Sequence, residues 1–424
     1  MAGLLKRTPR IAAVHLLSKG LQAVRSRHPW IFEDSIARIP EGLEPGDIAV
    51  LFDKKRKLGA ALADPDSDIR LRVLAFGASA PDIGPELFRR LAEKAAARRQ
   101  GMFGADTNAW RLANGESDGF PGFVADRYAD VLSVKVYSAA WLPHLENVLA
   151  AFFSANPELK RTAIRLSREI ASLPALRRLN YEDGILRGGP GWDGTVRFLE
   201  NGLTFETNVR FGQKTGFFLD QRENRARVGE LAKNAGKVLN VFSYSGGFSL
   251  YAARNGAGEV TDIDFSKPAL EASERNFELN RHWPGVAACR HRTIPDDAFH
   301  AMLELEKRSE RFDVVIVDPP SFAKAANERK QALNSYSRLA VRAVRLLKKH
   351  GLLVFASCSS RVQADELFAA VHAAASNEGL PLQELERRAE APDHPADFRE
   401  SHYLKCMYAR IRGIASVELG KNQF

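Results

Sequence analysis

The spacing of hydrophobic and polar residues changes along the chain, and each change marks a different kind of structure. Between about residues 11 and 76, short apolar runs are separated by turn residues at Pro45-Gly46 and Asp64-Pro65-Asp66. Several short strands spaced in this way predict a small β-barrel. The runs that predict its strands are Ala12–Leu16, Asp47–Phe52, Leu58–Leu62 and Ile69–Leu74.

A second pattern begins after a break at 81–84 and mixes helical and strand periods. It predicts one helix over 85–100 and another near 141–156. The predicted strands are Ala109–Ala113, Gly122–Tyr128, Val131–Val136 and Thr162–Leu166. This α+β segment ends at about Gly191 and holds no recognisable catalytic constellation. We therefore expect it to be a spacer or a base-handling lobe.

From Val196 onward the chain alternates between strands and helices, which predicts a parallel sheet with helices on both faces. Asp220 is expected to cap a helix that runs to about Asn234. The residues His402–Ile411 alternate again and suit a final edge strand. The remaining predicted elements are strands near Leu199 and at Leu203–Thr207, a strand from Val238, strands at Glu259–Asp264, Phe312–Val317 and Gly351–Ser357, a helix over 267–280 capped by Ser266, and a long helix over 327–349.

Length and composition limit the kind of protein this can be. A chain of 424 residues is too long for one ordinary core, so two or three domains are expected. No apolar run approaches the roughly 20 residues of a membrane helix, and residues 1–10 lead into no apolar signal core, so we expect neither a membrane span nor secretion. The three cysteines are far apart, which indicates neither a disulfide framework nor a zinc site and favours a reducing cytoplasm.

The charge balance points to a polyanionic partner. Lys and Arg number 61 against 52 Asp and Glu, a formal charge of +9, and nucleic acid is the commonest partner of such a surface. A basic, soluble surface without a partner is the alternative. In the predicted barrel, His28, Trp30 and Phe32 lie beside cations, as in RNA readers that pair charge with stacking rings, although Trp30 and Phe32 could instead belong to the barrel core. The cations are Lys19, Arg25, Arg27, Lys54, Lys55, Arg56 and Lys57.

The stretch from Val238 to Ser249 predicts a nucleotide site. A buried strand runs into a glycine turn and then a helix, so backbone can approach a ligand and unpaired N–H groups face it. The turn lacks the glycine spacing of dinucleotide sites and of phosphate loops, which favours S-adenosylmethionine, a ligand with ribose and adenine but no diphosphate. Asp264 or Asp262 would hold the ribose, and the strand-end position favours Asp264. The expected contacts in the turn are Phe242, Ser243, Tyr244, Ser245, Gly246 and Gly247.

Further candidate residues follow other predicted strands, at the edge where such sheets bind ligands. Asp318 precedes two prolines, which fix its backbone beside the ligand. Asp297 stands before a helix and could contact adenine. Cys358 follows an apolar strand between two serines, where a thiolate could attack C6 of a pyrimidine and turn C5 into a nucleophile for a methyl group. A small buried hydrophobe is the alternative for this cysteine, and core or surface positions are expected for Cys289 and Cys406.

Several of these segments together resemble the bacterial large-subunit ribosomal RNA cytosine-C5 methyltransferase I family, over nearly the whole chain. They are Gln213–Arg222, Phe242–Phe248, Asp318–Phe322 and Ser357–Ser359, with His28–Trp30 near one end and Asp393–Pro395 and Tyr403–Lys405 near the other. The resemblance implies a PUA domain at 8–78, a central EEHEE-type α+β domain at 79–194 and a Rossmann-like α/β methyltransferase domain at 195–424. It also implies that Cys358 is the nucleophile and that the glycine turn, Asp264 and Asp297 contact the cofactor.

Within this framework we add Asp220, Gln221 and Phe265 as cofactor contacts, and Asp318 as the residue that holds the cytosine edge. The base that removes the C5 proton stays unassigned. The predicted reaction transfers a methyl group from S-adenosylmethionine to C5 of a cytosine in large-subunit ribosomal RNA, with the base flipped out of its stack. The alternatives are a purine N-methyltransferase with the same cofactor and a non-catalytic RNA-binding assembly factor. A homodimer is left open, and neither a metal nor a membrane partner is expected.

Overall fold

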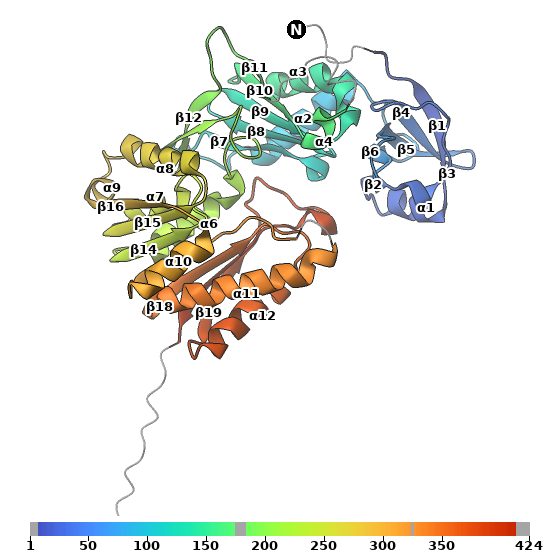
Figure 1. Cartoon of the computed structure of the whole chain (residues 1–424). Coiled ribbons are helices and arrows are strands. Elements are labelled where there is room, and N and C mark those ends of the chain that lie inside the picture. The colour runs from blue at the N-terminus through green and yellow to red at the C-terminus, as the bar shows by residue number, and fades with distance from the viewer. Residues whose placement is uncertain (1–6, 174–183, 324–325, 413–424) are drawn as a thin grey trace, which may run out of the picture. The chain divides into compact units, whose positions relative to one another are not determined.

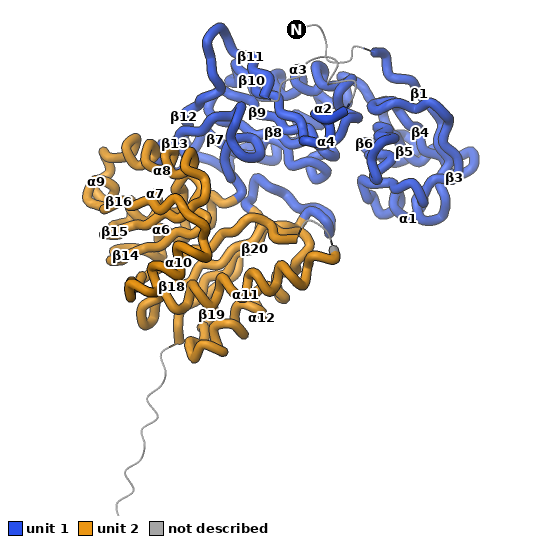
Figure 2. The backbone as a smooth tube through the Cα atoms, in the orientation of Figure 1, with its two compact units in different colours: residues 1–220, 391–401 blue, residues 221–390, 402–424 orange. Residues whose placement is uncertain are grey.

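The computed structural model describes residues 7–173, 184–323 and 326–412. The chain divides into two compact units (Figure 2): unit 1 comprises residues 1–220 and 391–401, and unit 2 comprises residues 221–390 and 402–424. Residues 195–220 and 391–401, which sequence analysis included in the methyltransferase domain, thus belong to unit 1.

The first part of unit 1 is a six-stranded sheet with the order β2-β6-β5-β4-β1-β3 (Figure 1). The four predicted strands are present, and the structure adds two short strands and a helix that lie between the first two of them. Apolar residues from β1, β4, β5 and β6 form its core. The elements are β1 (Ile11–Leu16), α1 (Ser18–Arg25), β2 (Trp30–Ile31), β3 (Ile36–Arg38), β4 (Ile48–Asp53), β5 (Arg56–Ala63) and β6 (Leu71–Phe76).

The second part of unit 1 is a five-stranded sheet, β11-β10-β9-β8-β7, beside a two-stranded hairpin of β12 and β13. One face of the larger sheet packs on helices α2 and α3 around buried aromatic residues such as Phe123, Trp141 and Phe152. The elements are α2 (Pro85–Arg99), β7 (Ala109–Asn114), β8 (Phe123–Tyr128), β9 (Val131–Val136), α3 (Leu145–Ala155), β10 (Arg161–Leu166), α4 (Arg168–Ala171), β11 (Ile185–Arg187), β12 (Thr195–Glu200) and β13 (Leu203–Asn208).

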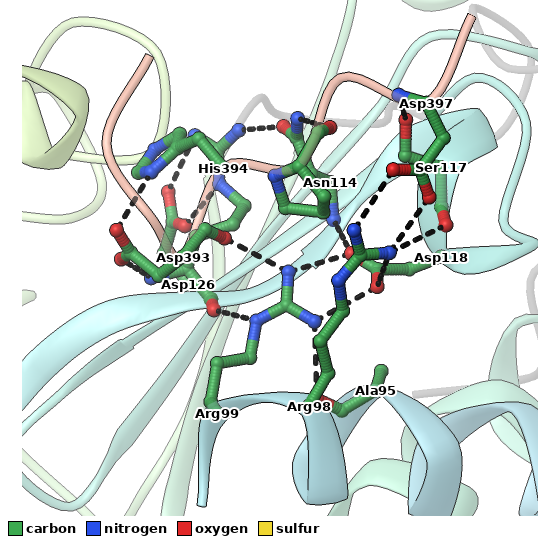
Figure 3. A network of polar contacts seen from close by, with 12 residues as sticks. Ala95, Arg98, Arg99, Asn114, Ser117, Asp118, Asp126, Asp393, His394 and Asp397 are labelled. Carbon is green, nitrogen blue, oxygen red and sulfur yellow. Dashed lines mark hydrogen bonds and ion pairs between the residues drawn. The ribbon is translucent and has the colours of Figure 1, made fainter. Parts of the chain in front are cut away.

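Residues 391–401 join unit 1 through a buried polar network (Figure 3). The fully buried Asp393 accepts the backbone N–H of Arg111 at 2.9 Å, and its own carbonyl accepts the Arg99 guanidinium at 2.8 Å. Arg99 in turn forms a two-bond ion pair with Asp118, at 2.8 and 2.6 Å. Nearer the surface, Arg98 pairs with Asp397. The segment is therefore part of the folded core of this unit.

Unit 2 is built on a seven-stranded sheet with the order β16-β15-β14-β17-β18-β20-β19. The first five strands are parallel, as predicted, but β20 runs antiparallel to both β18 and β19. The prediction of a final edge strand is wrong, because β20 is internal and β19 forms the edge. The strands are β14 (Lys237–Val241), β15 (Glu259–Asp264), β16 (Arg290–Pro295), β17 (Phe312–Val317), β18 (Leu347–Ser357), β19 (Leu382–Arg388) and β20 (Lys405–Ile411).

The helices of unit 2 fall into two groups: α6 packs on α7, while α11 packs between α10 and α12 (Figure 1). Two predicted details differ. The long helix ends at Leu346, because Leu347 already pairs in β18. Asp220 does not cap a helix, since it lies in a short turn and Gln221 is the residue before α6. The helices are α6 (Arg222–Leu231), α7 (Gly247–Arg254), α8 (Lys267–Leu279), α9 (Pro284–Ala288), α10 (Ala298–Lys307), α11 (Arg329–Leu346) and α12 (Ala364–Asn377).

None of the helices in the described ranges is both long and apolar enough to cross a bilayer.

Candidate active site

The glycine turn after β14 is held in a conformation that few residues adopt. Phe242, Tyr244 and Gly246 all have positive φ, at 62°, 49° and 73°. At Gly246 a side chain is also excluded by packing, because a Cβ atom there would lie 1.9 Å from the Oγ of Ser273. The glycine is therefore required by the tight contact between the turn and α8 as well as by its φ angle.

Two serine hydroxyls of this turn are candidates for ligand contacts. Ser243 and Ser245 are 5% and 4% exposed. Within the described part of the chain, the Oγ of each is buried without a hydrogen-bond partner. Since buried hydroxyls in native proteins are normally bonded, such a pair fits a turn that closes on a polar ligand. The N-terminus of α7, at Gly247, follows directly.

The carboxylate of Asp264 lies at the carboxyl end of β15 and is half-buried. Its Oδ2 accepts the N–H of Tyr244 and its Oδ1 accepts the N–H of Ser266, both at 2.8 Å. Each carboxylate oxygen can accept a second bond, so the group is fixed in place yet still able to hold a diol. The neighbouring Phe265 is 84% exposed and offers a bare aromatic ring beside it.

Asp262, the alternative ribose ligand, has a different environment. It is fully buried, and its oxygens accept bonds from Ser273 at 2.6 Å and from Asn240 at 3.2 Å. The hydroxyl of Ser249 and the imidazole of His291 also contact it. These hydrogen bonds within the protein occupy the carboxylate of Asp262, so the geometry favours Asp264 as the residue that can bind a ligand.

Asp297 is exposed and begins α10. Its Oδ1 accepts the backbone N–H groups of Phe299 at 3.0 Å and His300 at 3.1 Å, which makes it the N-cap of that helix. A contact with adenine, as predicted from the sequence, would be an additional role for a side chain that already caps this helix.

Asp318 follows β17 and is held by a chain of amide groups. The Nε2 of Gln221 donates to its Oδ2 at 2.9 Å, and the Oε1 of Gln221 accepts from Asn224 at 2.6 Å. Asn224 in turn accepts the hydroxyl of Tyr408, on β20, at 3.0 Å. The sequence predicts a cofactor contact for Gln221, whereas in the structure its amide donates to Asp318.

Cys358 lies just beyond the end of β18 and is half-buried. Because β17 and β18 are parallel neighbours, with Val317 paired to Phe355, Asp318 and Cys358 lie at the same edge of the sheet. Tyr336, from α11, bonds the Ser357 hydroxyl at 2.9 Å. Burial raises the pKa of Tyr336 against the opposing effect of the bond to Ser357, and the interactions with Cys358 and Asp318 raise it further, so the phenol stays neutral.

Lys405, the first residue of β20, is a functional candidate to which sequence analysis gave no role. It is 7% exposed and interacts electrostatically with Cys358. The other two cysteines are poor nucleophiles, because burial raises the pKa of the Cys289 thiol to about 11 and that of Cys406 still higher.

Asp220 and the motif that precedes it belong to unit 1. The carboxylate of Asp220 accepts from Lys214 at 3.2 Å. Thr215, 1% exposed, is bonded to the central sheet through Ser133 and Tyr128. The first half of the Gln213–Arg222 segment thus anchors a loop to that sheet.

The aromatic residues of the N-terminal sheet are only partly available to RNA. The indole N–H of Trp30 donates to Glu116 at 2.9 Å, and its ring lies edge-on to Phe398, 5.4 Å between centroids. Trp30 is therefore neither barrel core nor an open stacking platform. Phe32 is 38% exposed, and the β4–β5 turn exposes three consecutive cations, Lys54, Lys55 and Arg56.

Comparisons with known proteins agree with this geometry. Residues 185–410 match the family model of S-adenosylmethionine-dependent methyltransferases, and residues 14–76 match that of PUA-like domains. The chain is 44% identical over 394 residues to a ribosomal RNA large subunit methyltransferase of Deinococcus radiodurans, covering 92% of this chain and 94% of the relative. It is 35% identical over 402 residues to ribosomal RNA large subunit methyltransferase I of Tolumonas auensis, covering 94% and 98%.

Solved structures with the same fold include one from Streptococcus mutans assigned to the SAM-dependent methyltransferases, with a TM-score of 0.77 at 20% identity, covering 94% of this chain and all of the other. Another, also assigned to the methyltransferases, is complexed with SAH and has a TM-score of 0.78 at 20% identity, covering 95% of this chain and all of the other. The Rossmann-like class, the PUA-like domain and the cofactor S-adenosylmethionine are thus confirmed.

Proposed function

Because the chain belongs to the S-adenosylmethionine-dependent ribosomal RNA large subunit methyltransferase family, we propose that it methylates C5 of a cytosine in that RNA through a covalent adduct on Cys358. The single observation that carries this proposal is the position of Cys358. The residue is half-buried at the edge of the sheet where Asp318 and the glycine turn also lie. A half-buried cysteine at the ligand edge of the sheet can meet a base that enters the site, which supports a catalytic role.

S-adenosylmethionine, when bound, supplies an electrophilic methyl group on a sulfonium. Its fit to the chain rests on the buried Oγ atoms of Ser243 and Ser245 and on the diol-sized acceptor at Asp264. The exposed ring of Phe265 offers a surface for adenine. We assign these residues, with the backbone of the turn, to cofactor binding.

C5 of cytosine is too weak a nucleophile to take a methyl group unaided. In the proposed reaction the Cys358 thiolate adds to C6, and the electron pair of the C5–C6 bond moves to C5, which then takes the methyl group. A base removes the C5 proton, the electron pair re-forms the C5–C6 bond, and the thiolate leaves. Splitting one difficult step into easier ones is the general advantage of covalent catalysis.

Asp318 is proposed to hold the amino edge of the cytosine. Its carboxylate is oriented by Gln221, which is itself oriented by Asn224. A carboxylate fixed by such a chain accepts a hydrogen bond from an exocyclic amine at little entropic cost. The exposed cations of the β4–β5 turn are proposed to contact RNA phosphates, which would make the affinity salt-dependent.

The test is methylation of protein-free large-subunit RNA in vitro, followed by nucleoside analysis. The wild-type protein should produce 5-methylcytosine. Cys358→Ala should bind S-adenosylmethionine with unchanged affinity by calorimetry and give no product, whereas the matched control Cys289→Ala should retain activity. A methylated purine, or turnover by Cys358→Ala, would refute the covalent cytosine mechanism. Binding of RNA without binding of S-adenosylmethionine would point instead to an assembly factor.

A further inference from the structure

Lys405 clamps the turn that carries Cys358. Its Nζ donates to the carbonyl oxygen of Val362 at 2.6 Å and also to that of Ser359, the residue after the cysteine. On the strand side, Lys405 is paired directly with Ser357, the residue before the cysteine. Lys405 therefore fixes the backbone on both sides of the thiol, before it through the strand pairing and after it through the buried ammonium group.

The direction of β20 explains why a residue so far along the chain reaches this place. Parallel strands bring their carboxyl ends to the ligand edge of the sheet. Because β20 is antiparallel to β18, its amino end lies at that same edge. The backbone just before it is fixed by Glu390, whose Oε1 accepts the N–H of Tyr403 at 2.7 Å and that of Leu404 at 3.2 Å.

We propose that Lys405 is a positioning residue, which holds the Cys358 turn in place and keeps a positive charge against the sulfur so that Cys358 reacts as a thiolate. The thiol proton passes to water at this half-buried position. Three other ionisable groups belong to the same neighbourhood. Tyr336 of α11 interacts with both Cys358 and Asp318, and Glu390 interacts with Lys405. Among these groups of the described ranges, Lys405 is the one that carries a positive charge.

The charge is available under physiological conditions. Burial lowers the pKa of Lys405 to about 8, while the interactions with Cys358 and Glu390 oppose that shift. The group is thus mostly an ammonium ion at pH 7 and loses its charge as the pH rises through about 8. An opposite charge within about 4–6 Å typically lowers the pKa of an acid by about 1–3 units, and reactive cysteines lie in such electropositive surroundings.

The first test uses the wild-type protein without RNA or cofactor. The rate of alkylation of Cys358 by iodoacetamide is measured from pH 5 to 10, with peptide mass spectrometry and Cys358→Ser to assign the site. We expect an apparent pKa below the ordinary value of about 8.5. An apparent pKa at or above that value would overturn the proposal.

The second test removes the charge. Lys405→Met should raise the thiol pKa by about one unit. Because a more basic thiolate is also more nucleophilic, with a Brønsted slope of about 0.4–0.5, alkylation at pH 7 should slow by about three- to fourfold while the high-pH plateau rises. Lys405→Arg keeps the charge and should stay within about twofold of wild type at pH 7. The matched control is Lys348→Met, at the opposite end of β18, which should leave the profile unchanged.

Wild-type alkylation rates in Lys405→Met at every pH would overturn the proposal. If that variant does not fold, the proposal is still tested by the apparent pKa of the wild-type thiol and by the alkylation rate of Lys405→Arg. The role in methyl transfer rests on the proposed function. There, the pH profile of kcat for Lys405→Met should shift to higher pH with little change in KM for S-adenosylmethionine. Alkylation needs neither RNA nor cofactor, so a failure of the proposed function and a failure of this inference give different results.

Discussion

Asp118 offers a test of how residues 391–401 are held in unit 1. Its carboxylate accepts two bonds from Arg99 and the backbone N–H of Asn114 at 2.7 Å (Figure 3). Both side chains of the Arg99–Asp118 pair are 2% exposed. The Asp118→Asn variant keeps the shape of the side chain but removes its negative charge, so the buried guanidinium of Arg99 loses its counter-ion.

Breaking a buried ion pair from one side costs about 3–5 kcal/mol. Since asparagine retains one carbonyl acceptor, we expect a loss near the lower end, about 3 kcal/mol in the free energy of unfolding of unit 1. For a body of this size, about 2–4 °C per kcal/mol corresponds to a decrease in Tm of roughly 6–12 °C. The matched control is Asp397→Asn, because its pair with Arg98 has exposed fractions of 37% and 51% and surface pairs contribute only about 0–1 kcal/mol.

Urea denaturation followed by tryptophan fluorescence measures this loss, because every tryptophan except Trp283 belongs to unit 1. The expected result is a large decrease in stability for Asp118→Asn and a small one for Asp397→Asn. If Asp118→Asn stays within 1 kcal/mol of wild type, or if the two variants lose equal stability, the reasoning from burial is wrong.

Two further predictions concern the other parts of the fold. Gly246→Ala should destabilise unit 2 and abolish binding of S-adenosylmethionine, because its Cβ would lie 1.9 Å from Ser273 Oγ. Gly42→Ala has a similar φ of +70° with nothing within 4 Å, so it isolates the cost of the φ angle alone; calorimetry and thermal unfolding should show a much smaller effect. Burial lowers the pKa of His144, although its bond to the Gly46 carbonyl opposes this. In the unfolded chain the same histidine has a pKa of about 6.5, so at acidic pH it binds a proton more readily in the unfolded chain than in the folded protein. The free energy of unfolding should therefore fall as the pH drops below about 6.5, and His144→Asn should show a flatter dependence between pH 7.5 and 5.5 in urea titrations, whereas equal slopes would contradict this assignment.

Most of the strands could be predicted from local pattern, and the exceptions have physical causes. The residues of β20 are buried on both faces of the sheet. An alternating run of residues, considered by itself, does not show whether its strand lies inside a sheet or at the edge. The true edge, β19, alternates exposed and half-buried positions after its buried first residue and contains so many Glu and Arg residues that its apolar signal is weak. The sequence therefore predicts the existence of β20 but not its neighbour.

The candidate site was predictable as far as it depends on parallel strands. Asp264 ends such a strand, Asp318 and Cys358 follow such strands, and the alternation of strands and helices brings these strand ends to one edge. Lys405 could not be found in this way, because it precedes a strand that runs in the opposite direction. The partners of Asp393 were likewise beyond local pattern, since Arg111 is 282 residues away along the chain.

Residues 391–401 fold with unit 1 although the segments on either side of them belong to unit 2, and this determines how the protein can be divided into fragments. The polypeptide passes between the two units three times, after residues 220, 390 and 401. A fragment beginning at 221 would carry Asp393 and His394, which are buried in the intact protein, away from the side chains that surround them. Neither half expressed alone would be complete, so a two-plasmid complementation system should place the break inside a single unit, at an exposed loop, rather than at the boundary after residue 220.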